Sequence, residues 1–498
     1  MTTRLLVSCL LFASGCSLLL DTNTVQCTTD ADCEHFGGHP SCQEGVCVPS
    51  GLGPEGCFFG TPTTDEEFQN QCSTAECIPF DNCARFGYCT PSDTLPLVAP
   101  PTATAAPAPV IVPPTPAVNC ADVGPNIIYV TGSTNFPPLL KAVAPLLLAD
   151  TPSYYVVWQS TSSCNGVETI FNPDPTKHLI KDVPPVGSTP ANWAFYYNAD
   201  GTTTTCYLDP AGNVVDVGQT DVYAQTCNPA YAPNSTIAGY LGPIQTMTFV
   251  VPSSSTQRSL SAEAAHYVFG AGSMTPTGPV APWTDPALYF IRSPTTGTNQ
   301  MISKVIDVPP TKWWGVDRRT AANLSLLMQG VDPTSAERAI GVLSNDAADR
   351  ARDNLRILAF QAFKQRCGYL PDSTTTSLDK RNVRDGHYPI WGPVHLYTAI
   401  SGGVPTPAAN ALITKLTVPK PNQALLDAII DAGFVPQCAM QVSRTDEVGK
   451  LSAFAPPYHC GCYFDYRTNG LTTCQACTGP AQCPANKPAC NNGYCEAQ

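Results

Sequence analysis

The chain has 498 residues, of which 43% are hydrophobic and 13% charged, and its 26 basic and 39 acidic side chains give a net charge of -13. Such a length exceeds one ordinary domain, so several compact units are expected. A globally acidic chain repels nucleic acid and anionic lipid, which excludes both as general partners. A pocket for a small anion is not excluded, because local donors and not the net charge form such a pocket.

The start of the chain has the pattern of an export signal. Arg4 precedes an apolar run over 5–12 that is too short to span a bilayer, and three small residues then lead to Cys16. This resembles the lipobox of bacterial lipoproteins, in which the cysteine becomes the lipidated N-terminus; the alternative is a secretory signal that is cut elsewhere. We therefore expect a signal peptide over 1–15, a lipid anchor at Cys16 and a place in the cell envelope, on the outer membrane or the cell surface.

The cysteine content indicates an oxidising compartment. The chain has 24 cysteines, and removing Cys9 with the signal and Cys16 with the anchor leaves 24 - 2 = 22, an even number. Four cysteines within about twenty residues cannot enclose a hydrophobic core, so disulfides must replace it. Two similar modules of this kind bracket the protein, Cys27-x5-Cys33-x8-Cys42-x4-Cys47 and Cys477-x5-Cys483-x6-Cys490-x4-Cys495.

We place disulfide-rich modules over 16–92 and 456–498. The stretches His459-Cys460-x-Cys462 and Cys474-x-x-Cys477 have spacings that also occur in zinc and redox sites. In an exported, cysteine-dense chain these cysteines are expected to form disulfides, so no metal site is predicted.

Between the modules the composition changes twice. Residues 93–118 are rich in Pro, Ala and Thr, which favours an extended spacer, and residues 119–455 have a globular composition. In chain order we predict a strand over 126–131, a helix from 137, a strand over 154–159, a helix over 166–171, a helix over 261–269 capped by Ser261 and ended by Gly270, a strand over 339–344 and a helix over 347–363. Strands that alternate with helices predict an α/β domain with mainly parallel sheets.

Three loops combine hydroxyl side chains with the predicted start of a helix. They are 131–136 (Thr-Gly-Ser-Thr-Asn-Phe), 160–166 (Ser-Thr-Ser-Ser-Cys-Asn-Gly) and 292–298 (Arg-Ser-Pro-Thr-Thr-Gly-Thr). The N–H groups and the dipole of a helix N-terminus favour negative charge, and the guanidinium fork of Arg292 suits a phosphate. Taken alone, Arg292 also fits a surface or ion-paired arginine, Asp221 a turn residue and Ser163 a helix cap.

The order and spacing of these loops resemble the phosphate-binding protein of the phosphate-specific ABC transporter, a class II periplasmic binding protein. Arg292-x-x-x-Thr296-Gly297-Thr298 is similar to that family's Arg-x-x-x-Ser-Gly-Thr, and Asp216-Val-Gly-Gln-Thr-Asp221 to its Asp-Phe-Gly-x-Ser-Asp. Thr296 and Asn135 stand where the family has Ser and Thr, and two further positions depart from it. Pro294 stands where it has an acidic residue, and Cys164 is not a family feature, so we expect Cys164 in a disulfide with Cys206 or Cys227.

The resemblance implies an α/β fold of two lobes, the Venus-flytrap architecture of type II periplasmic binding proteins, flanked by the disulfide-rich modules. Lobe 1 would hold about 120–225 and 385–455, lobe 2 about 226–384, and the ligand would lie in the cleft between them. The residues implied to touch the ligand are Asn135, Phe136 (through its backbone), Ser163, Asp221, Arg292, Thr296, Gly297 and Thr298. A carboxylate in an anion pocket is useful only if the ligand carries a proton, so Asp221 would select phosphate over sulfate.

The function predicted from the sequence is that of an extracytoplasmic, lipid-anchored solute-binding protein for inorganic phosphate or a similar oxyanion, with an ABC permease as a candidate partner. We predict no cofactor, no metal and no catalytic residue. The first alternative is a cell-surface structural or interaction lipoprotein that keeps the fold without binding phosphate. The second is a phosphoryl-cleaving enzyme, for which the sequence has no evident nucleophile–base pair or metal cluster.

Overall fold

The computed structural model describes residues 25, 27–29, 32, 41–43, 45–48, 57–89, 93–98, 118–181, 192–470 and 472–497. These residues form two compact units, one within 1–73 and one within 74–498. The expected signal over 1–15, the expected anchor at Cys16, the module cysteine Cys33 and most of the expected spacer lie outside the described residues. Of the helices that are described, none is long and apolar enough to cross a membrane.

The first unit contains two small disulfide-bonded segments. Strands β1 (Ser41–Gln43) and β2 (Val46–Val48) pair as an antiparallel hairpin, which the disulfide Cys27–Cys42 ties to the preceding chain. Helix α1 (Asp65–Gln69) begins at a capping box, and the disulfide Cys57–Cys72 closes the loop that carries it. Disulfides stabilise these small segments, as a hydrophobic core stabilises a larger domain.

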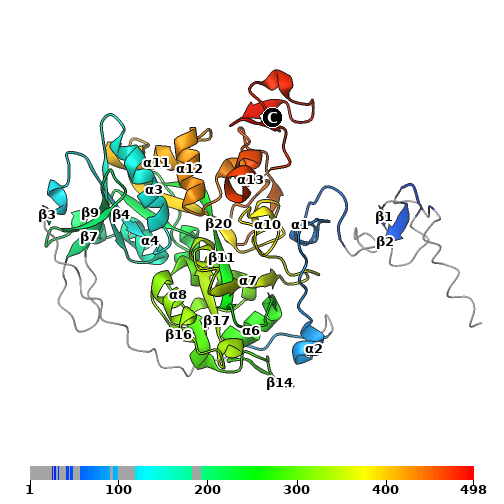
Figure 1. Ribbon diagram of the computed structural model, residues 1–498. Coiled ribbons are helices and arrows are strands. Elements are labelled where there is room, and N and C mark those ends of the chain that lie inside the picture. The colour runs from blue at the N-terminus through cyan, green and yellow to red at the C-terminus, as the bar shows by residue number, and fades with distance from the viewer. Residues whose placement is uncertain are drawn as a thin grey trace, which may run out of the picture. The chain divides into compact units, whose positions relative to one another are not determined.

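The second unit is built on a mixed sheet of 13 strands. Its two longest strands, β11 (Ile237–Pro252) and β20 (Trp391–Ser401), pair antiparallel with each other (Figure 1). The other strands of this sheet are β3 (Val118–Asn119), β4 (Ile127–Gly132), β5 (Tyr155–Ser160), β7 (Trp193–Tyr197), β8 (Thr203–Tyr207), β10 (Val217–Thr220), β15 (Tyr289–Ile291), β16 (Val316–Asp317), β17 (Ile340–Ser344), β18 (Leu355–Ile357) and β21 (Val404–Pro405). The strand order is β16–β15–β17–β11–β20–β10–β4–β5–β7–β8–β3, with β18 beside β11 and β21 beside β20.

Parallel pairing is confined to the two sides of this centre. Strand β4 pairs parallel with β5 and β10 on one side, and β15 pairs parallel with β16 and β17 on the other. The centre is antiparallel, so the prediction of mainly parallel sheets is wrong there. Five two-stranded sheets complete the unit: β6 (Leu179–Ile180) with β9 (Asn213–Val214), β12 (Ser259–Ser261) with β19 (Ala359–Gln361), β13 (Met274–Thr275) with β14 (Gly278–Pro279), β22 (Val442–Ser443) with β23 (Ser452–Ala453), and β24 (Ala489–Asn491) with β25 (Tyr494–Glu496).

Helices cover the sheet in two groups. The helices of the unit are α2 (Asn82–Phe86), α3 (Pro137–Leu148), α4 (Ser163–Phe171), α5 (Ala224–Cys227), α6 (Ala262–Ala271), α7 (Gly297–Ile306), α8 (Ala321–Gln329), α9 (Asn345–Asp349), α10 (Arg381–Arg384), α11 (Pro407–Thr417), α12 (Gln423–Asp431) and α13 (Gly461–Asn469). Helices α3, α4, α11 and α12 gather around β4, while α6, α7 and α8 gather around β17 (Figure 1).

Helices and strands of the unit enclose separate hydrophobic cores. Leu139 and Val143 of α3 pack with Leu412 of α11 in one core, and Leu324 and Met328 of α8 lie in another. Full burial of such side chains stabilises the fold by roughly 1.5–3 kcal/mol each. The ends of the parallel strands are thereby held by rigid packing on both sides of β11 and β20.

Most predicted elements are confirmed to within a few residues. Strands β4, β5 and β17 match the predicted ones, and α3 begins at Pro137 as expected. Helix α4 begins at Ser163, three residues before the predicted start. Ser261 caps α6, but the helix continues through Gly270 and ends at Gly272, whose φ of 59° is the left-handed conformation that glycine adopts easily.

The helix predicted over 347–363 is wrong. Helix α9 ends at Asp349, and the chain then forms strands β18 and β19. Leu355 and Ile357 are buried where β18 pairs with β11, and the ring of Phe360 stacks on that of Phe249. Burial against the sheet outweighs the helical preference of this segment, because propensity is worth only tenths of a kcal/mol per residue.

The two segments with the similar cysteine spacing share their backbone geometry. The hairpins place Cys42 opposite Cys47 and Cys490 opposite Cys495. The turn glycines have nearly equal left-handed φ values, 84° at Gly45 and 86° at Gly493. The first cysteine of each spacing bonds to the third, as Cys27–Cys42 and Cys477–Cys490.

The hydrogen bonds of these two segments also correspond. The N–H of Cys27 donates to the Gly45 carbonyl at 3.3 Å, and that of Cys477 to the Gly493 carbonyl at 2.8 Å. The next residue, Thr28 or Thr478, donates through both its N–H and its hydroxyl to one side-chain oxygen four residues later, that of Asp32 or Gln482. The chain therefore contains two copies of one small disulfide-bonded segment, one near each end.

Candidate anion-binding site

The three hydroxyl-rich loops and the loop after β10 follow the carboxyl ends of parallel strands. Because β5 and β10 both pair parallel with β4, their following loops leave from one edge of the sheet. The loop after β15 comes from the other side of the strand order and meets them, since the N–H of Cys164 donates to the Thr295 carbonyl at 3.0 Å. The fold thus brings together four loops that are far apart in sequence.

Asp221 lies at the centre of these loops and is fully buried. Its Oδ2 accepts hydrogen bonds from Ser133 Oγ at 2.5 Å, Asn135 Nδ2 at 2.9 Å and Ser163 Oγ at 3.3 Å. Its Oδ1 accepts a hydrogen bond from Gln219 Nε2 at 3.3 Å. One carboxylate therefore accepts hydrogen bonds from the loops after β4 and β5 and from strand β10.

The surroundings of Asp221 raise its pKa above the usual value of an aspartate. Burial raises the pKa of Asp221, because a carboxylate loses its hydration when it leaves water, while the hydrogen bonds from Ser133, Asn135, Gln219 and Ser163 lower it. Hydroxyl and amide donors of this kind can serve any oxyanion of similar size, and here they serve a side chain of the protein.

The start of α7 packs directly against this carboxylate. A Cβ on Gly297 would lie 2.6 Å from Asp221 Oδ2 and 2.6 Å from Ser163 Oγ, so only glycine fits without a shift of these groups. The Oγ1 of Thr298 accepts a hydrogen bond from Asn135 Nδ2 at 3.1 Å and donates to Met247 Sδ at 3.5 Å. The helix N-terminus and the other loops are therefore in van der Waals contact.

Arg292 supplies the positive charge next to this cluster. It is fully buried, its Nη2 donates to Thr134 Oγ1 at 2.5 Å, and its Nε donates to the Arg319 carbonyl at 2.9 Å. Its Nη1 has no hydrogen-bond partner among the described residues. Burial lowers the pKa of Arg292 to about 10, with nearby acids including Asp221 opposing that shift, so the guanidinium stays charged at neutral pH.

Asn299 and Thr296 hold the Arg292 loop in its conformation. Asn299 Oδ1 accepts the N–H of Arg292 at 3.3 Å, and Asn299 Nδ2 donates to the Arg292 carbonyl at 2.6 Å. Thr296 is the N-cap of α7, because its Oγ1 accepts the N–H of Asn299 at 3.5 Å and donates to the Ser293 carbonyl at 2.7 Å. The hydroxyl of Thr296 therefore serves the loop rather than the cluster around Asp221.

Two strained backbone positions fix the loops after β4 and β5. Gly132 has a φ of 141°, and a Cβ there would lie 1.8 Å from the Gln219 carbonyl oxygen, which excludes every other residue. Ser162 has a φ of 154°, unusual for a residue with a side chain, while its hydroxyl caps α4 by accepting the N–H of Asn165 at 3.3 Å. Strain of this kind persists where the surroundings determine the backbone closely.

Of the eight residues implied by the resemblance, five lie in direct contact around one carboxylate: Asn135, Ser163, Asp221, Gly297 and Thr298. Arg292 joins them through Thr134, and Thr296 adjoins Gly297 in the chain. Phe136 has its side chain in the hydrophobic core with α3, and its N–H faces the Ser133 carbonyl at 3.4 Å.

The sequence-based set omits three residues that the structure places in the cluster, Ser133, Thr134 and Gln219. Ser133 and Thr134 stand in the loop 131–136, whose hydroxyl content was the available signal. Gln219 lies on β10, two residues before Asp221, and its Oε1 accepts the N–H of Ser133 at 3.0 Å. A single glutamine within a strand offers no pattern that would reveal such a contact.

A disulfide holds the loop after β5. Cys164, the neighbour of Ser163, bonds to Cys227 of α5, so the second of the two expected partners is confirmed. Cys206, the other expected partner, bonds to Cys120. The start of α4 is thereby tied to the segment that follows Asp221 in the chain.

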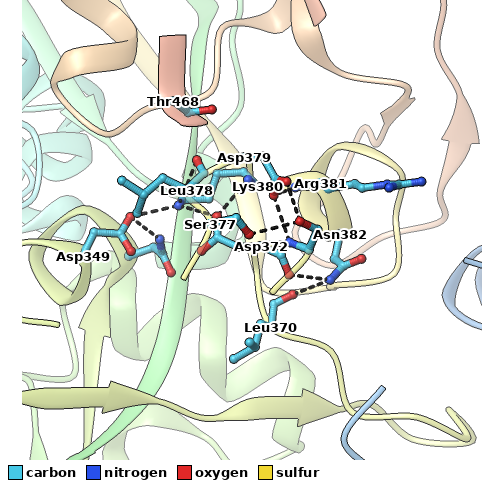
Figure 2. Close-up of polar contacts among 12 residues, drawn as sticks. Asp349, Leu370, Asp372, Ser377, Leu378, Asp379, Lys380, Arg381, Asn382 and Thr468 are labelled. Carbon is cyan, nitrogen blue, oxygen red and sulfur yellow. Dashed lines mark hydrogen bonds and ion pairs between the residues drawn. The ribbon is translucent and has the colours of Figure 1, made fainter. Parts of the chain in front are cut away.

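A second buried polar cluster lies away from these loops. Lys380 Nζ contacts Asp372 at 2.8 Å and Asp349 at 2.9 Å, and Figure 2 shows the three side chains pointing toward one another. Arg352 uses all five of its N–H donors, on the carboxylates of Asp349 and Asp372 and on the carbonyls of Thr375 and Ser377. Two acids and two bases pair with one another, so this cluster leaves no donor for a ligand.

The cysteines whose spacing also occurs in zinc and redox sites form disulfides. The pairs are Cys438–Cys460, Cys462–Cys474 and Cys477–Cys490, which confirms the expectation for these positions. The sulfurs of Cys477, Cys483 and Cys490 lie within 4.8 Å of one another. Because each is oxidised, none is a thiolate that could bind zinc.

No protein-family model matches the chain, and no curated protein matches its sequence. Solved structures of phosphate-binding proteins resemble it at low identity. An ABC-type phosphate transport receptor from Vibrio cholerae is 13% identical, with a TM-score of 0.38, over 62% of this chain and 99% of the receptor. A phosphate-binding protein from Stenotrophomonas maltophilia is 12% identical, with a TM-score of 0.37, over 63% of this chain and 91% of the other.

A further solved structure of this kind is a high-affinity periplasmic phosphate-binding protein bound with phosphate. It is 16% identical, with a TM-score of 0.40, over 62% of this chain and 90% of the other. At such identities a structural likeness says nothing of the ligand that this chain binds. The mixed α/β fold and the disulfides are seen in the structure of this chain itself.

Proposed function

We propose that this chain is an extracytoplasmic solute-binding protein that holds inorganic phosphate, or a related protonated oxyanion, in the cluster around Asp221. One observation carries the proposal. Donors from the loops after β4 and β5 converge on one buried carboxylate oxygen, and the start of α7 and the guanidinium of Arg292 adjoin them.

The chemistry of binding follows from exchanging one acceptor for another. An oxygen of the ligand would take the hydrogen bonds that Ser133, Asn135 and Ser163 now donate to Asp221 Oδ2. The N-termini of α4 and α7 would add backbone N–H groups and the positive ends of their dipoles. Arg292 would contribute Nη1, which has no hydrogen-bond partner among the described residues.

Asp221 gives this site its proposed selectivity. Once its donors have moved to the ligand, the carboxylate needs a proton donor of its own. Hydrogen phosphate offers a hydroxyl for this purpose, whereas sulfate offers none at neutral pH. An unpaired carboxylate against sulfate would cost about 2–5 kcal/mol, which is a factor of at least ten in affinity.

The proposal includes a two-lobed arrangement that closes over the ligand. Strands β4, β5 and β10 with α3 and α4 would belong to lobe 1, and strands β15 and β17 with α6, α7 and α8 to lobe 2. Strands β11 and β20 would form the connection. The contacts of Cys164 with Thr295 and of Asp221 with Gly297 would then belong to the closed state, in which water is excluded.

The proposal also includes a lipid anchor at Cys16 in the cell envelope and delivery of the anion to an ABC permease. What supports an oxidising, extracytoplasmic location is the number of disulfides along the described chain. Labelling with a radioactive fatty acid in a bacterial host, with Cys16→Ser as the control, tests the anchor.

Isothermal titration calorimetry of the phosphate-depleted protein tests the ligand. We expect phosphate to bind with sulfate unable to compete, and Arg292→Lys to weaken binding by about 30- to 100-fold, because lysine cannot replace the guanidinium fork. The matched control is Arg338→Lys at an exposed ion pair with Asp285, which should leave affinity unchanged. Absence of heat with both anions would refute phosphate binding.

The repeated disulfide unit favours a second candidate, a surface interaction protein that has kept the fold without the ligand. A small disulfide-bonded segment near each end of the chain suits display outside the cell. The calorimetric experiment separates the two candidates, and a chromogenic phosphate ester, which we expect to remain uncleaved, tests for hydrolysis.

A further inference from the structure

A second carboxylate approaches the site from a distant part of the chain. Glu447 lies in the segment that joins β22 to β23, and its Oε2 accepts the N–H of Tyr223 at 3.2 Å. Tyr223 is two residues after Asp221, and its hydroxyl donates to the Arg444 carbonyl at 2.8 Å. The segment of Glu447 therefore binds both the backbone and the side chain of the turn that carries Asp221.

The other oxygen of Glu447 faces the interior. Its Oε1 is excluded from solvent and has no hydrogen-bond partner among the described residues. A Cβ on Gly392 of β20 would lie 3.7 Å from this oxygen, 3.4 Å from the Asp221 carbonyl oxygen and 3.2 Å from Met301 Cε of α7. Glu447 thus reaches the place where β20, α7 and the Asp221 turn meet.

The backbone beside Glu447 is strained. Val448 has a φ of 53°, in the left-handed region that a β-branched residue rarely adopts. Such a conformation is unfavourable and persists only where the surroundings impose it. Arg444 anchors the segment, since its Nη1 donates to the Pro389 carbonyl at 3.1 Å and its guanidinium lies 4.0 Å from the Trp391 ring centroid.

Charged and titratable groups face Glu447 from each element around it. They are Arg444 and Asp446 on its own segment, Asp221 and Tyr223 on the turn after β10, Lys304 on α7, and Tyr397 on β20. The surroundings raise the pKa of Glu447 to about 7: burial is the main cause, the negative charge of Asp221 also raises it, and the Tyr223 N–H, Arg444 and Lys304 oppose the shift. This carboxyl therefore changes charge near neutral pH.

We propose that Glu447 is a positioning residue of the oxyanion site, a second carboxylate that holds the Asp221 turn and weakens anion binding when it is charged. The inference rests on the proposed function. It adds to that function a positioning residue and a dependence of anion affinity on the charge of this residue. When Glu447 is neutral, the turn carries the charge of Asp221 alone. When Glu447 loses its proton, a second negative charge lies behind the first and repels the incoming anion.

The substitution Glu447→Gln tests this inference, because the amide keeps an acceptor for the Tyr223 N–H and removes the charge. The control is Asp446→Asn, which removes the same charge from the neighbouring, exposed residue. Phosphate affinity of all three proteins is measured by calorimetry at pH 5.5, 6.5, 7.5 and 8.5. The ligand's own protonation affects all three equally, so ratios between proteins isolate the contribution of the side chain.

We expect the affinity ratio of Glu447→Gln to wild type to rise about tenfold from pH 5.5 to pH 8.5, the size expected for one charge near a partly buried site. The ratio of Asp446→Asn to wild type should stay within about twofold. A constant ratio for Glu447→Gln would overturn the regulation, even if phosphate binds well.

A second measurement without phosphate separates this inference from the proposed function. A carboxyl with a raised pKa contributes stability that is lost as pH rises through the folded-state value. The thermal midpoint of Glu447→Gln should therefore gain on that of wild type between pH 5 and pH 8. If wild type binds no phosphate, the proposed function fails while this difference still reports on Glu447; parallel midpoints for both proteins would overturn the charge state assigned to it.

Discussion

The Oγ of Ser133 donates a 2.5 Å hydrogen bond to Oδ2 of Asp221, which lies 88 residues further along the chain. The Ser133 hydroxyl also accepts the N–H of Asn135 at 3.0 Å. It therefore connects the backbone of the loop after β4 to the Asp221 carboxylate. Because Asn135 donates to the same Oδ2, the loop closes a small ring around one negative charge. The ring thus directs two side-chain donors at one acceptor oxygen.

The first prediction concerns Asp221→Asn. The neutral side chain still offers an oxygen to part of the donors, but it no longer repels an anion that has no proton. We expect the preference for phosphate over sulfate to fall by roughly tenfold or more. The free energy of unfolding should fall by roughly 1–3 kcal/mol, because the amide NH2 group leaves some of the buried donors without an acceptor.

Competition calorimetry with the two anions, followed by urea unfolding, measures both effects. The control is Asp122→Asn, which removes an exposed carboxylate elsewhere in the same compact unit. An unchanged preference for phosphate over sulfate in Asp221→Asn would show that this carboxylate does not select the ligand by accepting a hydrogen bond from its hydroxyl.

The second prediction concerns Gly297→Ala. The added methyl would lie 2.6 Å from both Asp221 Oδ2 and Ser163 Oγ, so the start of α7 must move away from the loops after β5 and β10. We expect a loss of roughly 1–3 kcal/mol of stability from overpacking and a loss of phosphate affinity of at least tenfold. Gly479→Ala is the matched control, because nothing lies within 4 Å of its Cβ position. Unchanged stability and affinity in Gly297→Ala would contradict the close contact.

The parts of the fold that the sequence could predict depend on short-range signals. Strand β4 and the start of α3 at Pro137 follow from hydrophobic runs and from a proline at the first helical position. The capping of α6 by Ser261 follows from the same local chemistry. Hydroxyl-rich loops after strands are likewise visible in the sequence, and the family resemblance singles out Asn135 and Ser163 within them.

The parts that could not be predicted depend on contacts between distant segments. Strand β18 forms because β11 offers it a partner across about a hundred residues, and no local pattern predicts that pairing. Glu447 reaches Tyr223 across 224 residues, from a segment with no motif. The hydroxyl of Thr296 was assigned by position in a motif, whereas its geometry is that of an N-cap. Sequence patterns predict which loops converge better than they predict where each side chain points.

The third prediction concerns the disulfide beside Ser163. Removing it as the pair Cys164→Ser and Cys227→Ser opens a loop with a sequence separation of 63, which costs about 4 kcal/mol in the chain-entropy model. The same change at Cys83 and Cys89, with a separation of 6, costs about 2 kcal/mol and serves as the control.

Urea unfolding measures the two losses, and calorimetry measures phosphate binding. We expect only the Cys164–Cys227 variant to lose affinity, because that bridge holds the start of α4 against the Asp221 turn. Equal affinities for the two variants would show that the bridge supports the fold and not the site.

The last prediction concerns His395, a buried residue on β20. Its ring lies parallel to that of Tyr397 at 5.9 Å and close to that of Tyr223 at 4.2 Å, and its Nε2 has no hydrogen-bond partner among the described residues. Burial lowers the pKa of His395 to about 3, so the folded protein keeps it neutral while the unfolded chain binds a proton below about pH 6.5. The stability that this pKa difference contributes is fully present above pH 6.5 and is lost as pH falls toward 3.

The substitution His395→Phe keeps an aromatic ring and cannot titrate. We expect its free energy of unfolding to gain about 2–3 kcal/mol on that of wild type when the pH is lowered from 7.5 to 4.5, as measured by urea unfolding. Parallel stability curves, or an NMR titration in which the His395 ring takes up a proton near pH 6.5 in the folded protein, would contradict the buried neutral histidine.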